Sequence, residues 1–240
     1  MTLNYNIKTF AQIDSTMDKA AQELDDTAVE GLVIHAMSQE QGRGRQGKHW
    51  HAPMGNLYLS IVLSPAIEKK DCGQLAFVCA CALVEAVTSL CDKDIDIRVK
   101  WPNDVLVDGK KIAGILIESK GDAYIAGIGL NILAPPEGAI GLKDITDKRV
   151  PINPVRDFLL DVLDAYYTRW LKEGFEVIQK TWMEKAAFLD EEIAIKLSEK
   201  EETGIFKGID KNGCLLLEQN GDIQTFYSGE IYSGAGAQNP

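Results

Sequence analysis

Cationic side chains concentrate in one glycine-rich segment, which runs from Gln39 to Trp50. Arg43, Arg45 and Lys48 lie in this segment, although the chain of 240 residues carries a formal charge of −11. Glycine lets a backbone approach a ligand closely, and arginine offers forked donors to phosphate or carboxylate oxygens. The segment therefore predicts an anion-binding loop that closes over its ligand and excludes water. The alternative interpretation is a solvated flexible loop.

A second group of polar side chains comes where a strand is expected to end. The run from Lys100 to Asp104 follows the alternating stretch 95–100, and Pro102 then forces a turn. Lysine at this point would neutralise phosphate or carboxylate charge, and Asn103 or Asp104 could hold a Mg²⁺–phosphate unit. The alternative is a solvated lysine at the edge of a sheet.

Glycine recurs inside segments that otherwise have the pattern of strands. Gly114 lies within 111–118, and Gly127 and Gly129 shortly precede Asn131. Glycine weakens the interior of a strand unless a bulge or a closely approaching ligand requires it. Its recurrence in neighbouring strands predicts that a ligand lies across the sheet, with Asn131 offering a donor and an acceptor at the end of the last strand.

These groups supply positive charge but no nucleophile, since no reactive thiol, serine–histidine pair or pair of acids stands out. Such a site suits nucleotidyl transfer between bound substrates, in which catalysis is mainly positioning and charge stabilisation. Activation of a carboxylic acid by ATP to an acyl-adenylate fits well, because two anions must be brought together. The G-x-G-x-x-G pattern at Gly42–Gly47 is followed by Pro53 and Gly55 rather than by a helical pattern, so a dinucleotide-binding fold is not expected.

The rest of the chain must position these groups. Apolar periodicity predicts helices at about 16–24, 72–91, 154–171 and 174–188, and strands at 31–37, 57–63, 95–100, 105–107, 111–118 and 124–131. One of the polar residues Asp14, Ser15 and Thr16 is expected to cap the first helix. The dipeptide Asp108-Gly109 predicts a hairpin turn.

The pattern changes near Asp190. Asn212-Gly213 and Asn220-Gly221 separate short alternating runs and predict a meander of strands from about 191 to 232. The predicted fold class is α+β, with a mixed β-sheet flanked by helices and a small β-barrel after it. We expect a first domain at 1–188, the barrel at 189–234 and a flexible tail at 235–240.

The composition limits which classes of partner and which cellular compartment are expected. A charge of −11 disfavours nonspecific binding to nucleic acid or anionic lipid. The longest apolar run, Leu75–Val84, has half the length of a membrane span and predicts a buried helix. The N-terminus has no signal-peptide pattern, and the five cysteines include no C-x-x-C pair, so a reducing cytoplasm is expected.

Four motifs taken together resemble the biotin–protein ligases. They are Gly42-Arg-Gly-Arg45 with Gly47 and Trp50, Lys100-Trp-Pro-Asn-Asp104, Lys111-Ile-Ala-Gly114 and Gly127-Ile-Gly-Leu-Asn131. The resemblance covers about residues 8–134, and Ile205–Ile231 is similar to the C-terminal β-barrel of that family. It implies a class II synthetase-like catalytic domain, which binds biotin and ATP, followed by an SH3-like barrel.

The resemblance also implies a reaction in two steps. Biotin and MgATP form biotinyl-5′-AMP and pyrophosphate, and a lysine of a biotin carrier domain then attacks this intermediate. Lys100 and Arg45 match catalytic residues of the family. The matching biotin contacts are Ser15, Thr16, Gln39, Arg43, Gly44, Arg45, Lys100 and Gly114, and the matching nucleotide contacts are Arg45, Trp50, Asn103 and Asn131. The chain departs from the family at Met17, where asparagine is frequent, and at Lys48, where arginine is common.

Two other functions stay open at this point. A lipoate–protein ligase or octanoyltransferase would share the general fold, and a non-catalytic biotin-binding sensor would share the binding site. The first catalytic strand begins by about residue 7, so the DNA-binding domain of some family members is not expected. The expected partner is the carrier domain of a biotin-dependent carboxylase, without DNA or a membrane, and a homodimer is left open.

Overall fold

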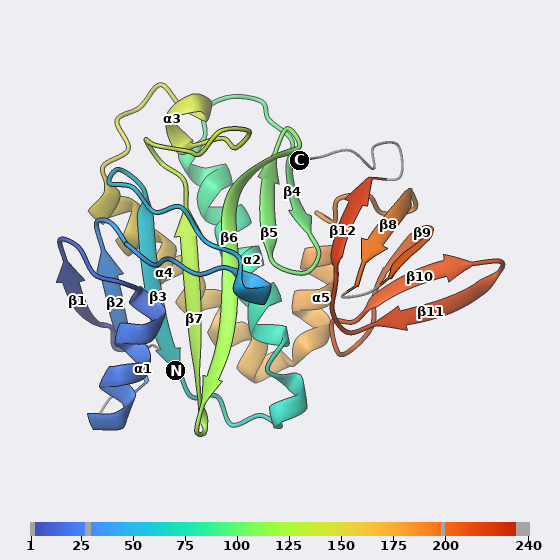
Figure 1. The fold of residues 1–240 in the computed structure, drawn as a ribbon, viewed down its shortest axis with the longest axis horizontal. Coiled ribbons are helices and arrows are strands. Elements are labelled where there is room, and N and C mark those ends of the chain that lie inside the picture. The colour runs from blue at the N-terminus through green and yellow to red at the C-terminus, as the bar shows by residue number, and fades with distance from the viewer. Residues whose placement is uncertain (1–2, 27–29, 198–199, 234–240) are drawn as a thin grey trace.

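The computed structural model describes residues 3–26, 30–197 and 200–233, which form two β-sheets and the helices that pack on them (Figure 1). The predicted tail at 235–240 lies outside these residues. The larger sheet has seven strands and the smaller has five. The smaller sheet begins at Glu192 and lies beside the edge of the larger sheet.

The larger sheet is mixed, as predicted. Its strands are β1 Asn6–Phe10, β2 Leu32–Ala36, β3 Leu57–Leu63, β4 Ile97–Lys100, β5 Asp104–Val107, β6 Lys110–Lys120 and β7 Ala123–Leu130. They lie in the order β1-β2-β3-β7-β6-β5-β4, with β1 and β2 parallel and the other pairs antiparallel. The predicted hairpin joins β5 to β6, and both Asp108 (φ 48°) and Gly109 (φ 76°) adopt the left-handed conformation that a tight hairpin requires.

Helices cover both faces of this sheet. They are α1 Thr16–Asp26, α2 Gln74–Leu90, α3 Leu142–Ile145, α4 Ile152–Glu173 and α5 Phe175–Met183. Helix α1 packs on β2, β3 and β7, whereas α2 packs on the opposite face together with α4 and α5 (Figure 1). Two short 3-10 turns, η1 Arg45–Gly47 and η2 Lys69–Asp71, complete this part of the chain.

Strand β3 shows how the two faces differ. Leu57, Leu59 and Ile61 point into the large core formed with α2, and Val62 points to the smaller core under α1. Because successive side chains of a strand point to opposite faces, the sequence of β3 makes one face fully apolar. The other face also presents Ser60, and it is the face that carries the candidate site.

Helix α2 is the central element of the large core. The stretch Lys69–Leu90 is long and apolar enough to cross a membrane, but 67% of its most apolar window is buried inside the protein. Its residues pack on the sheet and on α4 and α5. The predicted buried helix is therefore confirmed.

The helix predicted at 174–188 is too long, since α5 ends at Met183. The chain from Lys185 to Ala187 instead pairs with the edge strand β4. The backbone N–H of Val99 donates to the carbonyl of Lys185 at 2.8 Å, and the N–H of Ala187 donates to the carbonyl of Val99 at 2.8 Å. This pairing satisfies backbone groups that a longer helix would leave exposed at the sheet edge.

The smaller sheet has an antiparallel, SH3-like arrangement. Its strands are β8 Glu192–Lys196, β9 Glu201–Ile209, β10 Leu215–Gln219, β11 Asp222–Phe226 and β12 Glu230–Ser233, in the order β11-β10-β9-β8-β12. Its core residues Ile193, Phe206 and Ile231 belong to the same buried cluster as Trp101. The Trp101 indole also donates to the carbonyl of Gly213 at 3.0 Å. The smaller sheet is thus fixed against the end of β4.

Candidate functional site

The first part of the site lies at the N-terminus of α1. Ser15 caps this helix, because its Oγ accepts a hydrogen bond from the N–H of Asp18 at 3.3 Å. The side chain of Gln39 accepts from the N–H of Thr16 at 2.7 Å, and the hydroxyl of Ser60 donates to that of Thr16 at 2.8 Å. The predicted residues Ser15, Thr16 and Gln39 therefore meet at one place.

The predicted anion-binding loop folds into a hairpin over the sheet. The N–H of Trp50 donates to the carbonyl of Gly42 at 2.8 Å, and the N–H of Gly44 donates to the carbonyl of Lys48 at 2.7 Å. A Cβ atom added at Gly42 would lie 2.5 Å from the Trp50 carbonyl oxygen. Glycine is therefore required at this position for the two arms of the hairpin to approach each other.

The strand glycines make room for side chains of the chain itself. A Cβ at Gly129 would lie 2.5 Å from the Trp50 indole, and one at Gly114 would lie 2.7 Å from it. A Cβ at Gly127 would lie 2.6 Å from the sulfur of Met17. Trp50 and Met17 therefore lie across these glycines, and the prediction that a ligand lies there stays a prediction. Met17, the first departure from the family pattern, thus supplies an apolar wall.

These groups enclose a first cavity of about 40 Å³. It is lined by Ser15, Thr16, Met17, Gln39, Arg43, Gly44, Trp50, Tyr58, Leu59, Asn103, Gly114, Ile115, Leu116, Gly127, Ile128 and Gly129. Such a volume holds only a few water molecules. A ligand of several rings can enter only if side chains of the loop move, and Trp50 and Arg43 belong to that loop.

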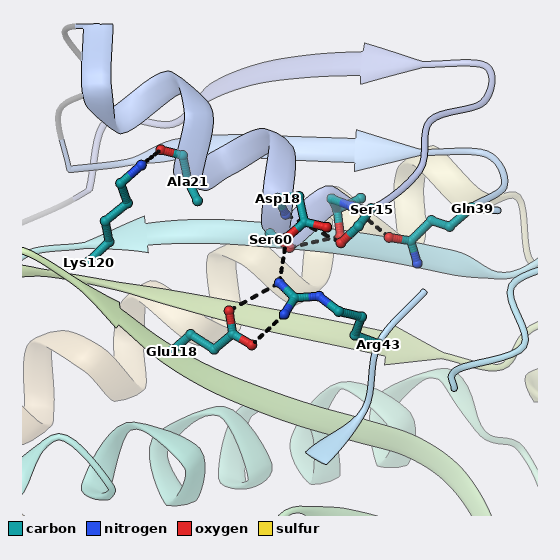
Figure 2. A network of polar contacts seen from close by, with 9 residues as sticks. Ser15, Asp18, Ala21, Gln39, Arg43, Ser60, Glu118 and Lys120 are labelled. Carbon is teal, nitrogen blue, oxygen red and sulfur yellow. Dashed lines mark hydrogen bonds and ion pairs between the residues drawn. The ribbon is translucent and has the colours of Figure 1, made fainter. Parts of the chain in front are cut away.

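Arg43 is held beside this cavity by two carboxylates (Figure 2). Its guanidinium donates to Asp18 at 2.6 Å and to both carboxylate oxygens of Glu118, at 3.1 and 3.2 Å. Asp18 comes from α1 and Glu118 from β6, so Arg43 links the loop to the helix and to the sheet. Neither partner could be predicted from the sequence, because both lie far from Arg43 along the chain.

Arg45 and Lys100 line a second cavity, of about 90 Å³, at the seam with the smaller sheet. Its lining comprises Gly44, Arg45, Gln46, Lys48, His49, Trp50, Lys100, Trp101, Pro102, Asn103, Asp104, Gly229 and Glu230. Gly44, Trp50 and Asn103 line both cavities, so the two adjoin.

Most cations of the second cavity have an oxygen partner. Arg45 donates to the Asn103 side chain and to the carbonyl of Gly229, each at 3.4 Å. Lys48 forms an ion pair with Glu230 of β12, and Lys111 forms one with Asp104 at 2.7 Å. The smaller sheet therefore contributes directly to this cavity, through Glu230, a residue that the sequence analysis did not single out. No spacing in the sequence connects positions so far apart.

Burial shapes the electrostatics of the second cavity. It lowers the pKa of the Lys100 ammonium, while the Asp104 and Glu230 carboxylates act in the opposite direction. Burial also lowers the pKa of the Arg45 guanidinium, against the same two carboxylates. Partly desolvated cations interact more strongly with an incoming anion than cations in water do.

Asn131 lines neither cavity. It is buried directly after β7, and its side chain donates to the carbonyl of Lys111 at 3.3 Å. In this conformation it fixes the start of β6, and its predicted contact with a nucleotide stays a prediction. The other predicted site residues line one or both cavities, and their individual roles in binding and catalysis stay predictions as well.

The donors present suit a nucleotide with its own metal better than a metal held by protein alone. Among residues 3–26, 30–197 and 200–233, no group of three or more His, Cys, Asp or Glu side chains could hold a metal ion. Mg²⁺ commonly binds through one or two carboxylates together with substrate phosphates. Asp104, between the cations of the second cavity, is the carboxylate that fits such a role.

Comparison with known proteins now identifies the family. Residues 9–132 match the model of the biotin/lipoate A/B protein ligase family, and residues 188–234 match that of the biotin protein ligase C-terminal domain. The chain belongs to this ligase family. It is 34% identical to biotin–[acetyl-CoA-carboxylase] ligase of Paracoccus denitrificans, over 93% of this chain and 99% of that protein.

Two further relatives support this assignment. The bifunctional ligase/repressor BirA of Bacillus subtilis is 31% identical, over 92% of this chain and 72% of its own length. The solved biotin protein ligase of Aquifex aeolicus, in complex with biotin and ATP, superposes with a TM-score of 0.83 at 28% identity and covers 95% of this chain and 97% of its own. The predicted fold and the predicted family are confirmed.

Proposed function

We propose that the chain is an ATP-dependent biotin–protein ligase that forms biotinyl-5′-AMP and transfers biotin to a lysine of a carrier protein. The observation that carries this proposal is the meeting of two unlike cavities at Gly44, Trp50 and Asn103. One cavity combines glycines and apolar side chains with a polar group at the α1 N-terminus, and the other gathers Arg45, Lys48 and Lys100. A carboxylic acid with an apolar body would suit the first cavity, and a polyphosphate would suit the second.

In the first step, a carboxylate oxygen of biotin attacks the α-phosphorus of ATP and pyrophosphate leaves. Lys100 and Arg45 lie where the two anions would meet, and their charges offset the repulsion between carboxylate and phosphate. The hydroxyl and amide groups of Ser15, Thr16 and Gln39 offer polar contacts to the ring system of biotin. Mg²⁺ bound to ATP would screen the charge of the pyrophosphate, and Asp104 is the residue that could help to hold it.

In the second step, the amine of a lysine attacks the acyl carbon of the mixed anhydride, AMP leaves and an amide bond remains. The intermediate must be protected from water until the acceptor arrives. The hairpin from Gln39 to Ala52 lies over both cavities and can supply that protection, because its glycines and its ion pairs let it open and close.

The acceptor we propose is the biotin carrier domain of a biotin-dependent carboxylase, in the cytoplasm. The Paracoccus relative, which is named for ligation to acetyl-CoA carboxylase, supports this choice. Biotin is preferred over lipoate because the relatives described above are biotin ligases and because residues 188–234 match the C-terminal domain of biotin ligases. A homodimer, and the lack of binding to DNA or membranes, stay predictions.

The exchange of labelled pyrophosphate into ATP tests the proposal. We expect exchange that requires biotin and Mg²⁺ and that proceeds without any carrier protein. Exchange driven by lipoate instead would favour the lipoate ligase alternative. A protein that binds biotin but supports no exchange would be a sensor rather than a ligase.

A further inference from the structure

Strand β12 of the smaller sheet presents an aromatic ring to Lys100. The ammonium nitrogen of Lys100 lies 5.3 Å from the centroid of the Tyr232 ring, within the range of a cation–π interaction. The carboxylates near Lys100 are engaged elsewhere, since Asp104 pairs with Lys111 and Glu230 pairs with Lys48. The ring face is thus the contact that fixes the direction of the ammonium.

We infer that Tyr232 is a positioning residue for Lys100, with its ring holding the ammonium at the wall of the second cavity; this inference rests on the proposed ligase function. The chemistry of the contact favours such a role. A carboxylate partner would neutralise the lysine and would have to be displaced by substrate. A ring attracts the cation without neutralising it, so the charge stays available to the phosphate and the carboxylate.

Tyr232 can be changed without removing a core side chain. It is half-buried, whereas its neighbour Ile231 is fully buried in the core shared by the two sheets. The strand is anchored by pairing with β8, in which Tyr232 lies opposite Ala194. A substitution at position 232 should therefore leave the smaller sheet folded.

The ring and the hydroxyl of Tyr232 have separate contacts. Burial, followed by the nearby Glu230 carboxylate, raises the pKa of the Tyr232 hydroxyl, and that carboxylate also holds Lys48. The ring contacts Lys100. Tyr232→Phe keeps the ring and removes the hydroxyl, and Tyr232→Leu removes both. The pair of variants therefore separates the proposed role from a role in holding Glu230.

The test measures biotin-dependent pyrophosphate exchange in the full-length variants. We expect Tyr232→Leu to lower kcat by about tenfold, the effect of losing one partly desolvated cation–π contact, with KM for biotin changed by less than about twofold. Tyr232→Phe should stay within about twofold of the parent. Tyr227→Leu is the matched control, since Tyr227 lies in the turn between β11 and β12 and its residue surface is 82% exposed.

A double-mutant cycle decides whether the effect passes through Lys100. In the Lys100→Ala background, Tyr232→Leu should cost less than about twofold, because the group that it positions is gone. An equal loss in both backgrounds, or equal losses for Phe and Leu at position 232, would overturn the inference. If Tyr232→Leu does not fold, Tyr232→Met serves in its place, and the thermal midpoint of each variant is measured alongside.

Exchange measured in the parent protein distinguishes a failure of this inference from a failure of the proposed function. Absence of biotin-dependent exchange in the parent would refute the ligase proposal itself. Normal exchange in the parent together with normal kcat in Tyr232→Leu would refute the positioning role alone.

Discussion

The two cavities of the site are built in different ways. The first, under the α1 N-terminus, combines residues held by neutral hydrogen bonds with glycines that Trp50 and Met17 cover. Its one cation, Arg43, is already paired with two carboxylates. The second lies at the seam between the sheets, where cations pair with oxygens of Glu230, Asp104 and the Gly229 carbonyl. The first cavity therefore depends on shape, and the second depends on charge.

Because the two cavities are built differently, they should respond to different kinds of substitution. A change of one methyl group should disturb the first cavity, because its walls are in contact. A change of charge should disturb the second, because its cations are partly removed from water and respond strongly to any altered partner.

The largest effect is expected at the second cavity. Lys100→Ala should reduce adenylate formation by about 10²–10³, the cost of one donor that stabilises developing charge. Single-turnover formation of biotinyl-5′-AMP measures this rate, and the thermal midpoint controls for folding. Formation at a near-normal rate would remove Lys100 from the mechanism and end the claim that charge governs this cavity.

Arg45→Gly should release the intermediate as well as slow its formation. The side chain links the hairpin loop to Asn103 and to Gly229, and its removal frees the loop at the seam. We expect dissociation or hydrolysis of the adenylate to accelerate by about tenfold, the loss of about 1.4 kcal/mol of contact. Retention of labelled adenylate on a desalting column measures the effect, and retention equal to that of the parent would contradict this role.

A single methyl group tests the first cavity. Gly129→Ala places a Cβ 2.5 Å from the Trp50 indole, so the indole must shift. Overpacking of about 1 kcal/mol would weaken biotin binding by about fivefold, as measured by calorimetry. Gly73→Ala is the matched control, since a Cβ there meets nothing within 4 Å. Equal affinities for the two variants would show that shape does not govern this cavity.

A fall in pH should lower the stability of the sheet that supports both cavities, and should not act on one cavity more than on the other. Burial, followed by the charge of Arg156, lowers the pKa of His35 to about 4, with Asp157 opposing. Arg156 Nη1 lies 3.3 Å from His35 Nδ1, which fits a neutral ring that accepts a hydrogen bond. The unfolded chain therefore binds the proton first as the pH falls. Stability should be fully present above pH 6.5 and should decline towards pH 4.

The free energy of unfolding in urea measures this loss. Between pH 7 and pH 5 the His35 contribution should fall by about 2 kcal/mol. A His35→Gln variant should lack that part of the pH dependence, while exchange activity at pH 7 should change least of all the variants. An unchanged pH dependence in the variant would show that His35 does not titrate as described.

Local rules sufficed to predict much of this molecule from its sequence. Alternation in β4 placed Val99 in the core and Lys100 at the cavity, and Asp108-Gly109 marked the hairpin. The residues Ser15, Thr16 and Gln39 could be named because the family motifs carry them. Each of these features depends on neighbours in the sequence or on a motif of fixed spacing.

Contacts between distant segments could not be predicted in this way. The pairing of 185–187 with β4 overrides a helical pattern, because the sheet edge offers unsatisfied backbone groups. The carboxylates that hold Arg43 come together only when α1 packs on the larger sheet. Glu230 and Tyr232 reach Lys48 and Lys100 only when the two sheets pack together. No periodicity encodes them.

The most direct test of the proposed function is to identify the small molecule that the protein forms from biotin and ATP at the two adjoining cavities. The protein is incubated with biotin, ATP and Mg²⁺ in the absence of any carrier, and the small molecules that stay bound are eluted and measured by mass spectrometry. The account predicts biotinyl-5′-AMP, close to one per chain. Recovery of biotin and ATP side by side, without the adenylate, would contradict it.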